Sequence, residues 1–100
     1  MIITLVKADF SSKNIGTLNS FAVLTNLGLG CTYNGPVTVE KNGSFNATIS
    51  ISNNYLLNDN GLIITMGGNN ITSNAVVNNN SITINIAEVT GIINIIVLTS

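Results

Sequence analysis

Ser81 to Leu98 is the stretch that most constrains how this chain can fold. Isoleucine alternates with threonine, asparagine and alanine over residues 82–87, the two-residue period of a strand with one buried and one solvated face. After a break at 89–91, residues 92–98 are apolar on both faces, apart from Asn94. Such a strand is either central in a sandwich or covered by a partner chain. A helix is disfavoured, because most of these residues are β-branched and no cap precedes them.

The rest of the chain reads as further short strands separated by turn residues. The predicted strands are Met1–Phe10, Phe21–Thr25, Cys31–Tyr33, Val37–Glu40, Ser44–Ser52, Leu62–Met66, Ile71–Thr72 and Ala75–Val77. Val37 and Val39 are expected to point inward, and the loop 53–61 is expected to plug one end with Tyr55 and its leucines. Eight or nine short strands without a helical period predict an all-β fold, an antiparallel β-sandwich.

One hundred residues correspond to a single domain over 1–100. Residues 1–20 form its N-terminal strand and loop, and we expect them to serve attachment or oligomerisation. The start of the chain lacks the basic and apolar regions of a signal peptide, and no run has the roughly 20 apolar residues of a membrane span. We therefore expect synthesis in a cytoplasm and no membrane partner.

The surface is expected to be polar but almost uncharged. Charged residues are 7% of the chain, against roughly 25% in ordinary soluble proteins, and asparagine, serine and threonine replace them. A net charge of −1 and only three cationic residues argue against nucleic-acid binding, which needs a basic patch.

Residues that carry catalytic chemistry are scarce. The four carboxylates, Asp9, Glu40, Asp59 and Glu88, are far apart in sequence, and the chain has no histidine. Cys31 is the only cysteine, and without histidine to activate it, it is interpreted as a small packing residue rather than a nucleophile. We expect no enzymatic activity, no cofactor and no metal.

Several phrases of the sequence resemble a known family. The opening Ala8-Asp9-Phe10-Ser11 with Asn14-Ile15-Gly16 is similar to a segment that begins modules of tail, fibre and head-decoration proteins in gut Bacteroides phages, including crAss-like phages. From Gly30 onward, TYNGPVTVEKNGSFNATIS, GLIITMGG and ITINIAEVTGIINI resemble an Ig-like repeat module of the same phages and of Bacteroidetes surface proteins. Asn54 departs from the family pattern, where a glycine precedes the aromatic residue.

The resemblance implies a structural virion protein, a small head-fibre or capsid-decoration protein that is released by lysis. It would bind the shell and itself, as a dimer or trimer, through strand pairing and apolar contact. The candidate interface residues lie in the two strands that are apolar on both faces: Ile2, Ile3, Leu5, Ile93, Ile95 and Val97.

The alternative is a carbohydrate-binding module that holds the particle to host or mucus glycans. Its candidate contacts are Tyr55, as the stacking residue, with Asn69 and Asn70 from a neighbouring loop. This hypothesis requires an exposed Tyr55 beside amide side chains.

Overall fold

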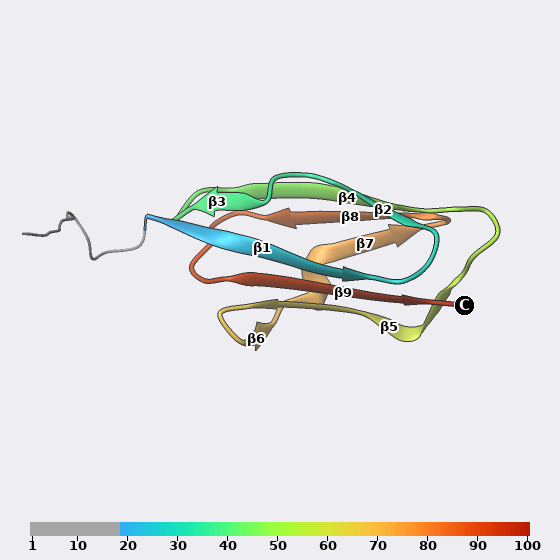
Figure 1. Cartoon of the computed structure of the whole chain (residues 1–100). Helices are drawn as coiled ribbons and strands as arrows, with labels where there is room; N and C mark the ends of the chain where they lie inside the picture. The colour runs from blue at the N-terminus through green and yellow to red at the C-terminus, as the bar shows by residue number, and fades with distance from the viewer. Residues whose placement is uncertain (1–18) are drawn as a thin grey trace, which may run out of the picture.

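The computed structural model describes residues 19–100, which form two packed β-sheets (Figure 1). The strands are β1 (Ser20–Leu27), β2 (Cys31–Asn34), β3 (Thr38–Glu40), β4 (Phe45–Ile51), β5 (Leu57–Met66), β6 (Asn69–Asn70), β7 (Ala75–Asn78), β8 (Ser81–Ile86) and β9 (Ile93–Thr99). A single turn of 3-10 helix, η1 (Thr72–Asn74), precedes β7. The predicted all-β sandwich of eight or nine strands is confirmed.

One sheet has the strand order β3-β1-β9-β5-β6 and the other the order β2-β4-β8-β7. Neighbouring strands are antiparallel except β1 and β9, which run parallel from Val23 beside Ile93 to Leu27 beside Val97. An antiparallel sandwich was expected from the sequence, and this parallel pair departs from that expectation. It joins strands from opposite ends of the described chain, which no hairpin connects.

The core lies between the two sheets and is made almost entirely of alternate strand residues. On β4 and β8 the inward side chains are those predicted from the alternation: Phe45, Ala47, Ile49, Ile51, Ile82, Ile84 and Ile86. On the facing sheet Val23, Val39, Ile64, Ile93, Ile95 and Val97 close the core. The prediction for Val37 is wrong, because this side chain is exposed while Val39 is buried.

The β9 strand is central in its sheet. Its residues that were predicted to contact a partner are buried within the chain instead. Ile93, Ile95 and Val97 are buried between the sheets, and β1 and β5 pair with the two sides of β9. The prediction that these three residues contact a partner is therefore wrong: their side chains are already packed within the chain. Ile2, Ile3 and Leu5, predicted with them, lie outside the described residues.

The two faces of β9 give a direct test of this assignment. We expect Ile95→Ala to lower the free energy of unfolding by about 2–5 kcal/mol, because it opens a cavity in the core. Leu98→Ala, on the outer face of the same strand, should change it by less than about 1 kcal/mol. Urea denaturation of both variants measures the difference, and similar losses for the two would contradict the burial of Ile95.

Candidate interaction surface

The outer face of the five-stranded sheet carries an apolar surface, which we call the outer patch: Leu24, Ile63, Ile92, Ile96 and Leu98. Strand alternation places all of them except Ile92 opposite the core residues of β1, β5 and β9, and Ile92 directly precedes β9. Leu24 is 51% exposed, Leu98 47% and Ile92 44%, while Ile63 and Ile96 are half-buried. The patch is therefore apolar surface that no other element in the described part of the chain covers.

Strand register brings the members of the outer patch together. Ile96 pairs with Ile63 of β5, and Leu24 of β1 pairs with Asn94, two residues before Ile96. Residues at such diagonal positions are roughly 7–8 Å apart, within reach of long side chains. Leu98 is also open to solvent, and its carbonyl oxygen lies so close to Gly61 that a Cβ added there would sit 2.7 Å from it.

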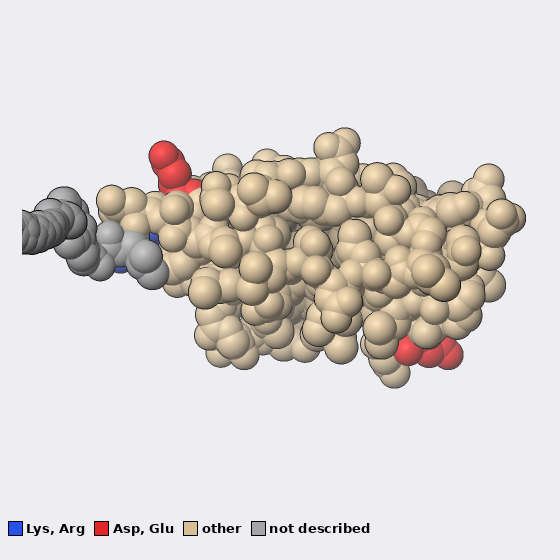
Figure 2. Space-filling model, viewed as in Figure 1, with Lys and Arg blue, Asp and Glu red and all other residues tan. Residues whose placement is uncertain are grey.

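Charge is nearly absent from the surface around the patch. The charged residues of the described range are Glu40, Lys41, Asp59 and Glu88, and each is exposed. Figure 2 shows a face that is almost wholly uncharged, with acidic side chains at two separate places. A partner would therefore meet apolar side chains, amides and hydroxyls, and salt would screen this contact little.

The residues predicted for glycan contact do not form one site. Tyr55 lies two residues before the start of β5, whereas Asn69 pairs with Met66 at the far end of that ten-residue strand. A strand of this length spans about 30 Å, so Tyr55 and the two asparagines lie at opposite ends of the molecule. The predicted grouping of Tyr55 with Asn69 and Asn70 is wrong. Asn70 has a local role, because its Oδ1 accepts a hydrogen bond from the backbone N–H of Thr72 at 2.9 Å.

Tyr55 is half-buried and packs against the core rather than standing free. Its ring lies on Gly30, where an added Cβ would sit 2.2 Å from Cδ2 of the ring. Gly30 also has φ +78, a conformation that glycine adopts without strain. Tyr55 and Leu57 therefore pack against the core at this end of the sandwich as expected, whereas Leu56 is exposed.

Two glycines with positive φ make the Tyr55 contact measurable. We expect Gly30→Ala to destabilise the protein by about 1–3 kcal/mol more than Gly68→Ala. Both substitutions force alanine into the left-handed region, but a Cβ at Gly68 meets nothing within 4 Å. Chemical denaturation gives both values. Adding Tyr55→Ala to the Gly30→Ala variant should recover part of the loss, and equal effects at the two glycines would refute the contact.

Cys31 is half-buried at the start of β2 and packs against the core. Removal from water raises the pKa of its thiol, and smaller effects of Gly28 and Thr99 act in the opposite direction. Because the thiolate is the reactive form, a raised pKa makes this cysteine slow to react at neutral pH. That agrees with its interpretation as a packing residue.

The reactivity of Cys31 should follow this shift. We expect the rate of alkylation by iodoacetamide to rise with pH and reach its midpoint above that of the urea-unfolded chain, which should lie near 8.5. Mass spectrometry of samples quenched over a pH series measures both profiles. A midpoint at or below that of the unfolded chain would show that burial does not control this thiol.

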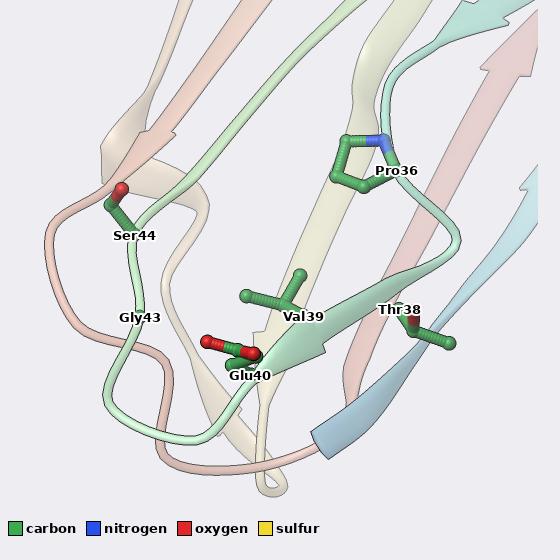
Figure 3. A pocket seen from close by; sticks show the side chains of 6 residues that line it. All are labelled: Pro36, Thr38, Val39, Glu40, Gly43 and Ser44. Atoms are coloured by element: carbon green, nitrogen blue, oxygen red, sulfur yellow. The ribbon is translucent and has the colours of Figure 1, made fainter. Parts of the chain in front are cut away.

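A second surface feature is a pocket of about 360 Å³ at the seam between the two sheets, which we call the seam groove. Its lining residues are Pro36, Thr38, Val39, Glu40, Gly43 and Ser44. They come from the segment before β3, from β3 itself, from the turn that follows it and from the residue before β4. At this place β3 and β4 diverge into different sheets (Figure 3). Glu40 is the only charged side chain among them, and the groove contains no nucleophile–base pair.

Residues 19–100 contain neither a metal-ligand cluster nor a helix that could cross a membrane. No three His, Cys, Asp or Glu side chains in this range gather as a metal site would require. In the same range, no helix has the length and hydropathy to cross a bilayer.

Comparison with known proteins adds no relative to these observations. A scan against protein-family models and searches of curated proteins and of solved structures gave no match. The outer patch and the seam groove are therefore interpreted from their own chemistry.

Proposed function

We propose that this chain is a non-enzymatic structural protein of a phage virion, a small head-fibre or capsid-decoration protein. The observation that supports the proposal most is the outer patch, a group of apolar side chains on a sheet face within an almost uncharged surface. Contiguous exposed apolar surface is typical of protein–protein contact sites. The resemblance of the sequence to virion modules supplies the partner, which is the capsid shell.

In this mechanism the outer face of the five-stranded sheet lies against the shell. Burial of leucine and isoleucine side chains supplies the free energy, and amides such as Asn94 at the middle of the face hydrogen-bond across the contact. The other sheet then faces solvent, and Asn46, Thr83 and Asn85 are among its exposed side chains. A surface of amides and hydroxyls is well suited to a particle exterior, since it stays hydrated without attracting charged ligands.

Leucines of the outer patch should control attachment. We expect Leu24→Thr combined with Leu98→Thr to weaken binding to the particle at least tenfold. Each leucine is about half exposed, so burying the remainder contributes about 1 kcal/mol per side chain. Co-sedimentation of the purified chain with particles assembled without it measures the binding.

Leu56→Thr is the matched control, because Leu56 is also a well-exposed leucine but lies outside the patch. It should bind like the unchanged protein, and neither variant should lose thermal stability by more than a few degrees. Tight binding by the double variant, or equal weakening by Leu56→Thr, would rule out the patch as the attachment surface.

A further inference from the structure

β7 is the outermost strand of the four-stranded sheet, and its outer edge has no partner in the described part of the chain. Exposed strand edges usually carry charges, proline or bulges, which prevent pairing with another chain. β3, an outermost strand of the other sheet, ends at Glu40, which Lys41 follows. β7 has no such protection: residues 60–87 contain neither a charge nor a proline, the β7–β8 ladder runs without a register shift, and Val76 and Val77 are both exposed.

The hydrogen bonds of β8 fix which main-chain groups of β7 face outward. Ile51 N–H of β4 donates to the carbonyl of Asn80 at 2.7 Å, so even-numbered residues along β8 bond to β4. Odd-numbered residues of β8 therefore bond to β7, and their partners there are Val76 and Asn78. The intervening residues of β7 direct their main-chain groups to the open edge.

Four main-chain groups of β7 and its turn point to this edge. A trans peptide unit directs its C=O and its N–H to opposite sides, so each group bonded to β8 turns the other group of its peptide unit outward. The outward groups are the carbonyl of Ala75, the N–H and the carbonyl of Val77, and the N–H of Asn79. The N–H of Ala75 is not among them, because it donates to the carbonyl of Thr72.

We propose that β7 pairs antiparallel with β7 of a second copy of this chain, across a two-fold axis at Val77, so that the two four-stranded sheets become one continuous sheet. In this register the row of four groups is complementary to itself. Each Val77 N–H donates to the carbonyl of the other Val77, and each Asn79 N–H donates to the carbonyl of Ala75 in the other copy. Such self-complementarity is the requirement of a two-fold interface. The pairing needs no shell, so it does not depend on the proposed function.

The occupied N–H of Ala75 favours a second copy over an unrelated strand. A regular strand would place a carbonyl opposite this N–H and leave that carbonyl without a donor. In the second copy the residue at this position is Asn79, which has φ +56 and begins the turn into β8. The chain therefore leaves the edge after the Asn79 N–H, and no carbonyl is stranded there.

The same register brings apolar side chains of the two copies together. Val77 lies opposite the buried Ile82 and so points to the core side of the sheet, yet it is 48% exposed. Across the axis it meets Val77 of the second copy at a Cα separation of about 5.5 Å, and each valine covers the other. Val76, which is 63% exposed on the outer face, lies opposite Asn78 of the second copy. No charge on either strand opposes the contact.

The dimer has a consequence for the proposed attachment. A two-fold axis between antiparallel strands of one sheet is perpendicular to that sheet, so both five-stranded sheets lie on the same side of the joined sheet. The outer patches of the two copies then face in the same direction. Two linked patches bind a surface with greater avidity than one.

Sedimentation equilibrium of the full chain, without particles, tests the pairing. The protein should form a reversible dimer with a Kd below about 1 mM. Val76→Lys should raise that Kd by about tenfold or more, because it places two lysines at diagonal positions roughly 7–8 Å apart. Val37→Lys is the matched control, since Val37 is an equally exposed valine outside β7, and its Kd should stay within about twofold of the unchanged protein. A monomer at about 1 mM, or equal effects of the two lysines, would overturn the proposal.

Disulfide formation between two variants tests the register. Chains with Val76→Cys are mixed with chains with Asn78→Cys, both in a Cys31→Ser background, and are oxidised mildly. Directly opposite residues of a pair that is not hydrogen-bonded have Cα atoms about 4.5 Å apart, within the range of a disulfide. Mass spectrometry should find that the mixed dimer exceeds about three quarters of the cross-linked product. Random pairing gives about one half, and that result would refute this register.

Hydrogen exchange distinguishes a second copy from cover by the chain's own residues. The Val77 N–H should exchange about tenfold more slowly well above the dimer Kd than well below it. The Val76 N–H is the control, because it bonds to β8 and should be protected at both concentrations. Protection of Val77 that does not change with concentration would show an intramolecular occupant and contradict the proposal.

Discussion

The burial of one face of β9 against the opposite sheet is the interaction on which the rest of the structure depends. Ile93, Ile95 and Val97 fill the core, while β1 and β5 hold the strand on both sides. That arrangement necessarily turns Ile96 and Leu98 outward. Because the described chain has only two layers, the outer patch is a direct consequence of placing a strand with two apolar faces at the centre of a sheet.

Sequence alternation was enough to predict β4 and β8 and their inward residues, since a two-residue period identifies a half-buried strand without knowledge of its neighbours. It could not decide what covers β9, because a central strand and a partner-covered strand have the same pattern. The face of β9 that was predicted to contact a partner is the wrong one, because Ile95 is buried in the core and Ile96 lies on the outer face of the sheet.

Features that depend on long-range strand pairing could not be predicted from the sequence either. The parallel β1–β9 pair and the early start of β5, with a register shift between Leu57 and Leu62, follow from strand order rather than local propensity. The early start of β5 also explains the failed grouping of Tyr55 with Asn69. Residues 53–61 were interpreted as a loop, whereas the strand that begins at Leu57 carries the two residues to opposite ends.

Attachment through the outer patch, as proposed, would leave an almost uncharged exterior facing solvent. Cryo-electron microscopy of the intact particle tests this most directly, by placing residues 19–100 in the map. If the outer patch binds the shell, the map should show density on the capsid with Leu24, Ile96 and Leu98 against the shell. A position on the capsid or tail in which these three side chains face solvent would contradict it.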